Sequence, residues 1–282
     1  MTSLPRVLIF IVAYNAAELI GDYLARIRHM LPGLAAMQPH LLIIDDSSPD
    51  DTVKVAANAL KDFPISWELL RTLENQGYGG NQKLGYSYAV AEGFDYVVLL
   101  HGDGQYDANQ VPALLAPLLA GEADAVLGSR MIHRRDALKG GMPIHKFCGN
   151  IALTWIQNRL LGSRLAEFHT GMRAWRVATL AALPFMHNRN GFGFDTEILV
   201  QAIDRKQRIA EIAIPTHYGD ETSHVNVFRY SAEVVADTIA SRLQRLGLMN
   251  LACFRYDPPP HHPSREARAM LAAMRAQGMA SA

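Results

Sequence analysis

Short apolar runs alternate with helix-like segments over the first 130 residues of the chain. Five runs read as strands buried on both faces, and they span residues 6–13, 40–45, 66–72, 95–100 and 123–130. Between the runs, apolar positions recur at helical spacing, and helices are predicted over residues 16–31, 52–60 and 109–119. Strands that alternate with helices form a mostly parallel sheet with helices on both faces. The pattern therefore predicts an α/β fold with a Rossmann-like sheet.

Polar clusters stand where the predicted strands end. They are Tyr14-Asn15, Asp45-Asp46, the Gly-rich loop 77–80, residues 101–105, and Ser129-Arg130. Open α/β sheets bind their ligands beyond the carboxyl ends of the strands. We therefore expect these clusters to share one binding edge.

The cluster His-Gly-Asp-Gly-Gln at 101–105 has the composition of a cation site. Carboxylate and amide oxygens suit a hard divalent ion such as Mg²⁺ or Mn²⁺, and an imidazole also binds Mn²⁺. The flanking glycines allow the backbone and a phosphate to approach closely. From these residues alone, a Gly-rich turn capped by Asp103 is an equal alternative.

Two other clusters leave alternatives open. One acid of the Asp45-Asp46 pair is expected to accept from a base or a ribose hydroxyl, whereas the other interpretation is a helix-capping turn. The loop 77–80 either holds phosphate or makes a tight turn. It matches neither the dinucleotide fingerprint nor a P-loop, which disfavours a dehydrogenase or an NTPase.

Composition narrows the partners and the organisation of the chain. The formal net charge of zero argues against a nucleic-acid-binding protein. The N-terminus does not read as a signal peptide, no apolar stretch is long enough to span a bilayer, and both cysteines read as reduced. These features predict a cytoplasmic protein, with peripheral binding to the cytoplasmic face of a membrane left open. We expect one domain over residues 1–250, followed by a Pro-rich linker and a short tail helix over 251–282.

Six motifs in order resemble family 2 glycosyltransferases, most closely the dolichyl- or polyprenyl-phosphate mannosyl- and glucosyltransferase branch. They are VAYN, IDDSSPDDT, NQGYGGNQKLGYSYA, HGDGQY, GSR and TGMRAWR, and the likeness covers about residues 6–230. The resemblance implies a GT-A fold, a nucleotide-diphosphate sugar donor (GDP-mannose or a UDP-sugar), a divalent metal and inversion at the anomeric carbon.

The resemblance also implies roles for individual residues. Positions that bind the nucleotide sugar correspond to Val12, Tyr14, Ile44, Asp46, Gly79, Asp103 and Arg130. The metal ligands correspond to His101, Asp103 and Gln105. Three residues correspond to catalytic positions. Arg130 matches an arginine beside the donor diphosphate, and Asp195 and Glu197 lie in the segment that carries an acid facing the acceptor.

The sequence departs from the family pattern in two places that bear on function. His101 stands where the D-x-D motif has its first acid, and Tyr218 and His224 replace the Arg and Lys that often contact a lipid phosphate. The resemblance nevertheless predicts a hexosyltransferase whose acceptor is a polyprenyl phosphate at a membrane surface. The alternatives are transfer to a sugar hydroxyl and a non-catalytic nucleotide-sugar-binding protein. The oligomeric state is left open.

Overall fold

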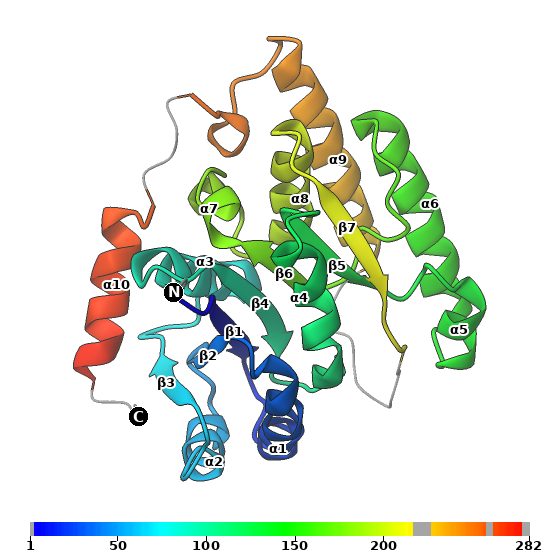
Figure 1. Cartoon of the computed structure of the whole chain (residues 1–282). Coiled ribbons are helices and arrows are strands. Elements are labelled where there is room, and N and C mark those ends of the chain that lie inside the picture. The colour runs from blue at the N-terminus through cyan, green and yellow to red at the C-terminus, as the bar shows by residue number, and fades with distance from the viewer. Residues whose placement is uncertain (1–2, 217–226, 258–261, 278–282) are drawn as a thin grey trace.

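A mixed sheet of seven strands forms the centre of the computed structural model, which describes residues 3–216, 227–257 and 262–277 (Figure 1). The strands are β1 Arg6–Ala13, β2 Gln38–Asp45, β3 Ser66–Arg71, β4 Tyr96–His101, β5 Ala125–Ser129, β6 Arg173–Arg176 and β7 Ile209–Ala213. Their order across the sheet is β3-β2-β1-β4-β6-β5-β7, and β6 alone runs antiparallel to its neighbours.

Helices cover both faces of this sheet. They are α1 Ile20–Met30, α2 Thr52–Ala59, α3 Tyr78–Ala91, α4 Val111–Leu119, α5 Arg134–Lys139, α6 Ile144–Leu161, α7 Val177–Leu180, α8 Phe194–Asp204, α9 Val227–Arg245 and α10 Arg265–Ala276. One buried cluster packs α1, α2 and α4 on one face, and a second packs α3, α8 and α10 on the other. Alternate side chains of β1, such as Ile9 and Phe10, belong to opposite clusters, as a strand buried on both sides requires. The predicted α/β fold is confirmed.

Strand β6 and helix α5 lie where the sequence did not predict them. β6 begins and ends with an arginine, so the apolar pattern that marks a buried strand is broken. Arg173 is nevertheless fully buried, because its guanidinium donates to the carbonyls of Thr170 at 2.9 Å and Asp195 at 2.8 Å. Helix α5 lies within residues 131–145, which the composition had indicated to be a loop.

The C-terminal helix α10 packs against α3 and β3 (Figure 1). Ser264 caps its N-terminus, and its apolar side buries Leu271 and Met274. Arg275 then pairs with Glu68 at 2.8 Å and with Glu92 at 2.9 Å. The domain boundary at residue 250 stays a prediction. None of the helices in the described ranges has the length and apolar composition needed to cross a membrane.

Candidate active site

A cavity of about 650 Å³ opens at the carboxyl ends of the central strands. Eight of the residues singled out from the sequence line it: Val12, Tyr14, Asp46, His101, Asp103, Gln105, Arg130 and Asp195. Three others, Ile44, Gly79 and Glu197, are not among the lining residues. The strand-end clusters thus meet at one edge of the sheet, as the sequence predicted.

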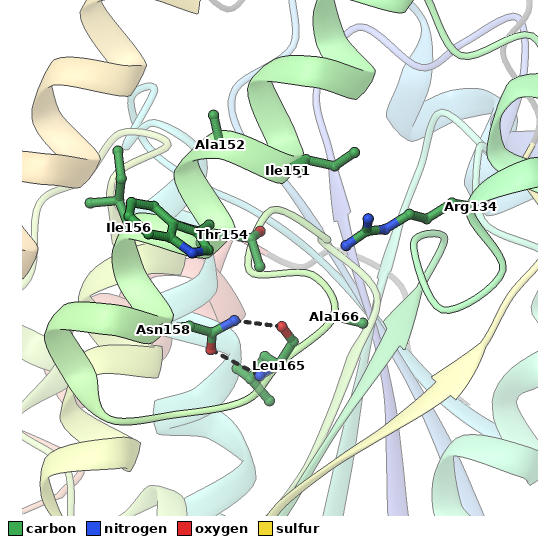
Figure 2. Close-up of a pocket in the computed structure, with 9 residues that line it drawn as sticks. Arg134, Ile151, Ala152, Thr154, Ile156, Asn158, Leu165 and Ala166 are labelled. Carbon is green, nitrogen blue, oxygen red and sulfur yellow. Dashed lines mark hydrogen bonds between the residues drawn. The ribbon is translucent and has the colours of Figure 1, made fainter.

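A second hollow, of about 590 Å³, lies along α6 and the loop that follows it (Figure 2). Asn158 closes part of it by bonding the backbone of Leu165, with its Nδ2 donating to the carbonyl at 2.8 Å. The lining residues include one cation, Arg134, but no carboxylate and no histidine. We therefore place the chemistry in the first cavity.

The adjacent acids Asp45 and Asp46 have separate surroundings. Asp45 is fully buried, accepts from the Ser48 amide at 3.0 Å, and lies 3.5 Å from Arg71 Nε. Asp46 lines the cavity, and its Oδ1 accepts a hydrogen bond from the backbone amide of Gln76 at 2.7 Å. Burial raises the pKa of both carboxyls. Asp45 therefore holds the turn after β2, whereas Asp46 is placed to contact a ligand.

Gly79 packs the start of α3 against the segment that leads into α8. Its amide donates to the Asn190 carbonyl at 2.7 Å, and an added Cβ would lie 2.6 Å from both the Arg189 carbonyl and Phe194 Cβ. The close approach explains why a glycine stands there. The cavity is lined instead by its neighbours Gly77 and Tyr78.

A chain of hydrogen bonds in the cavity wall connects His101 to Asp195. Tyr78 Oη lies 3.0 Å from His101 Nε2 and donates to Asp195 Oδ2 at 3.0 Å. The other oxygen of Asp195 accepts from Gln82 at 3.0 Å, and the buried Arg173 guanidinium lies 3.5 Å away. Burial lowers the pKa of His101, so its ring is neutral near pH 7.

The turn after β4 brings Asp103 and Gln105 to the cavity beside His101. Asp103 Oδ1 accepts a hydrogen bond from the backbone amide of Gln105 at 3.1 Å. Gly104, between them, adopts a φ of +66°, and the Arg26 side chain donates to its carbonyl at 3.1 Å. No group of three His, Cys, Asp or Glu side chains able to hold a metal occurs within the described ranges. One imidazole, one carboxylate and one amide nevertheless fit a divalent cation whose remaining ligands are phosphate oxygens.

Arg130 is fixed at the other end of the cavity by Glu167, which is fully buried. Its amide donates to Glu167 Oε2 at 2.7 Å and its Nε to Oε1 at 3.1 Å, and Nη2 bonds the His169 carbonyl at 2.6 Å. A guanidinium held on several sides loses little further freedom when it meets an anion.

Glu197 lies away from the cavity, although it is close to Asp195 in sequence. It is 3% exposed and accepts from the Arg189 amide at 2.7 Å. Burial raises its pKa to about 7. Its contacts are those of a residue that fixes the segment before α8.

A family model matches most of the sequence that forms this site. Residues 8–180 match the model for glycosyl transferase family 2, which is more than half of the chain. The chain belongs to this family. It is therefore a glycosyltransferase, and the resemblance drawn from the six motifs is confirmed.

Relatives of this glycosyltransferase carry names with lipid-phosphate acceptors. The undecaprenyl-phosphate mannosyltransferase of Micrococcus luteus is 29% identical over 74% of the chain and 82% of the relative. The polyprenol monophosphomannose synthase of Mycolicibacterium smegmatis is 25% identical over 74% of the chain and 76% of the relative.

Solved structures place the glycosyltransferase in the GT-A fold. Glucosyl-3-phosphoglycerate synthase from Mycobacterium tuberculosis, in complex with Mn²⁺, UDP and phosphoglyceric acid, matches with a TM-score of 0.62 and 19% identity. The match covers 87% of this chain and 80% of that one. Mannosyl-3-phosphoglycerate synthase from Rubrobacter xylanophilus gives a TM-score of 0.63 at 17% identity, over 87% and 76%. These likenesses establish the fold alone.

Sequence reasoning missed several residues of this glycosyltransferase's cavity. Tyr78 was hidden in the Gly-rich loop, and His169 stands one residue before the TGMRAWR motif. Lys146 and Tyr230 come from α6 and α9, which carried no recognised motif. Only the fold brings these segments beside β4. Tyr218 and His224 lie outside the described residues.

Proposed function

We propose that the chain is an inverting, metal-dependent hexosyltransferase that uses a nucleotide-diphosphate sugar and a polyprenyl phosphate. The observation that carries this proposal is the order of side chains along the cavity. Tyr14 and Asp46 follow β1 and β2, the turn with Asp103 follows β4, and Arg130 follows β5. Across the sheet these strands stand in the order β2-β1-β4-β6-β5, so Asp46 and Tyr14 lie at one end of the row and Arg130 at the other. Such a row suits a nucleoside at one end, its diphosphate in the middle and an acceptor at the other end.

The acceptor class is supported by the charge at the far end of the cavity. His145 and Lys146 of α6 line the cavity with Arg130, and Asn150 of the same helix bonds Glu167, which holds Arg130. Basic residues at this place suit an anionic acceptor, and the relatives' names include undecaprenyl phosphate and polyprenol monophosphomannose. The proposed setting is the cytoplasmic face of a membrane, where a peripheral enzyme meets a lipid phosphate.

The proposed mechanism needs no general base. A phosphate acceptor is ionised at neutral pH, so its oxygen attacks the anomeric carbon directly, from the side opposite the departing diphosphate. Both carboxylate oxygens of Asp195 already accept hydrogen bonds, from Tyr78 and Gln82, which suits a positioning role better than proton abstraction. Arg130 adds positive charge near the diphosphate as it leaves.

His101, Asp103 and Gln105 are the residues that would hold the divalent cation, Mg²⁺ or Mn²⁺. When bound, it would offset the negative charge of the leaving diphosphate.

The test combines a binding titration with a transfer assay. GDP-mannose, UDP-glucose and UDP-N-acetylglucosamine are titrated by calorimetry with Mn²⁺, with Mg²⁺ and with EDTA, and we expect metal-dependent binding of one donor. That donor, labelled in its sugar, is then incubated with undecaprenyl phosphate or with undecaprenol. Label in a lipid product only with the phosphate supports the proposal. Label transferred equally to undecaprenol, or binding of no donor, contradicts it.

A further inference from the structure

The His101 ring is held in one orientation by its neighbours. Tyr78 and Tyr106 meet it edge-on, with centroid distances of 5.4 Å and 5.1 Å. The third neighbour is Gly171, where an added Cβ would lie 2.4 Å from His101 Cε1. The segment before β6 thus lies directly against the ring, so the ring has little room to turn or flip.

The hydrogen bonds of Tyr78 fix which nitrogen of His101 carries the proton. The single hydroxyl proton of Tyr78 is donated to Asp195 Oδ2, 3.0 Å away. The oxygen of Tyr78 must then act as the acceptor toward His101 Nε2, 3.0 Å away. His101 therefore carries its proton on Nε2 and keeps the lone pair on Nδ1.

Asp195, the last acceptor of these hydrogen bonds, is itself held in place by two neighbours. Gln82 donates to its Oδ1, and the Arg173 guanidinium lies 3.5 Å away with no exposed surface. Four elements therefore contribute to the setting of one imidazole: β4, α3, α8 and β6. A metal-binding histidine commonly has its second nitrogen engaged in this way, which sets the tautomer and the direction of the lone pair.

We propose that Tyr78 and Asp195 are positioning residues that present His101 Nδ1 to the divalent cation, and that the enzyme prefers Mn²⁺ to Mg²⁺ as a result. The inference rests on the proposed metal-dependent function. An imidazole replaces a carboxylate at this position, so the donor set has one negative charge fewer and one nitrogen more. Imidazole nitrogen suits Mn²⁺ better than Mg²⁺, which favours oxygen ligands and keeps its water.

The decisive experiment observes the metal itself, without turnover. Mn²⁺ is added to the full-length protein with a saturating nucleoside diphosphate, and pulsed electron paramagnetic resonance measures its coupling to nitrogen. We expect a ¹⁴N coupling that changes to ¹⁵N when histidine is isotopically labelled and that is lost in His101→Ala. Absence of a histidine nitrogen coupling from Mn²⁺ bound with the nucleotide overturns the proposal.

Matched variants separate positioning from general packing. Tyr78→Phe removes the hydroxyl that contacts His101, whereas Tyr88→Phe removes a hydroxyl on the same helix that bonds Glu68 at 2.7 Å, away from the cavity. We expect Tyr78→Phe to lower the ratio of Mn²⁺ to Mg²⁺ affinity about tenfold, and Tyr88→Phe to leave it unchanged. His101→Asp should shift the preference toward Mg²⁺. Equal ratios in the Tyr78 and Tyr88 variants contradict the positioning role.

The tautomer gives a readout that requires neither metal nor transfer. In metal-free protein, ¹⁵N spectra should show His101 protonated at Nε2, and Tyr78→Phe should lose this single form. A proton fixed on Nδ1 in the wild type overturns the inference even if the enzyme transfers sugar. Conversely, nitrogen-coupled Mn²⁺ without transfer to any lipid phosphate contradicts the proposed function and leaves the role of Tyr78 standing.

Discussion

Asp195 and Glu197 lie two residues apart in α8 and face different surroundings. Asp195 lines the cavity and accepts from Tyr78, whereas Glu197 is buried against the Arg189 amide. Residues at this spacing do not share a helix face. The two acids therefore have different surroundings, although the family resemblance suggested a catalytic role for both.

Exchanging each acid for its amide should distinguish them. Asp195→Asn weakens the acceptor end of the chain from His101, so we expect kcat/KM to fall roughly 10- to 100-fold. Glu197→Gln should stay within about twofold, because its contacts lie outside the cavity. Initial rates at saturating Mn²⁺ measure both. A larger loss in the Glu197 variant than in the Asp195 variant would overturn this assignment.

Glu197 should also make stability depend on pH. Burial raises its pKa from 4.5 to about 7, so between these values the folded protein binds more protons than the unfolded chain. The free energy of unfolding therefore falls as pH rises through this window, by up to about 3 kcal/mol from this group. In Glu197→Gln that part of the decrease should vanish.

Urea unfolding at pH 5 and pH 8 measures the effect, and the exposed Glu122→Gln is the control. A residual decrease is expected in the Glu197 variant, since burial also raises the pKa of Asp237 to about 6. An unchanged pH dependence in Glu197→Gln would show that Glu197 is already ionised at low pH.

The adjacent acids after β2 give a third prediction. Asp46→Asn should weaken nucleotide binding about tenfold, since a charged acceptor at the cavity is lost. Asp45→Asn should lower the free energy of unfolding instead, because Asp45 bonds Ser48 and pairs with Arg71. Calorimetric titration with the nucleotide and urea unfolding of both variants are the measurements. The reverse pattern would assign the ligand contact to Asp45.

Much of this site was predictable because its residues stand at strand ends. Uninterrupted apolar runs mark β1, β2, β4 and β5, and parallel strands bring their carboxyl ends to one edge. Asp46, Asp103 and Arg130 were expected at this edge for that reason, and they line the cavity. The antiparallel β6 was not predicted, since Arg173 interrupts its apolar pattern and is satisfied by carbonyls and by the Asp195 carboxylate of the folded chain.

The division of roles among neighbouring residues required the structure. Gly79 was expected to bind the nucleotide sugar, but the segment that it contacts lies more than a hundred residues away. Tyr78 was missed for a related reason, because its partner Asp195 is 117 residues distant along the chain. The spacing of residues along the sequence does not predict such long-range contacts.

We expect His169 to bind the acceptor at the end of the cavity where Arg130 lies. Tyr230 Oη lies 3.0 Å from its Nδ1, while its buried Nε2 has no hydrogen-bond partner among the residues that the structure describes. Tyr230 engages Nδ1, so Nε2 is the ring nitrogen left to hydrogen-bond a ligand. Burial and the nearby Arg130 and Arg173 lower the pKa of His169 to about 3, so the ring stays neutral from pH 5 to 9.

We therefore expect His169→Ala to raise the KM for polyprenyl phosphate about tenfold and to leave the KM for the donor unchanged. His169→Gln, which retains a donor group, should recover part of the loss, and the exposed His29→Ala is the control. Kinetics with each substrate varied in turn measure both constants. Because the ring stays neutral, the ratio of variant to wild-type KM should be constant from pH 6 to 8. A rise in the donor KM alone would place His169 at the nucleotide instead.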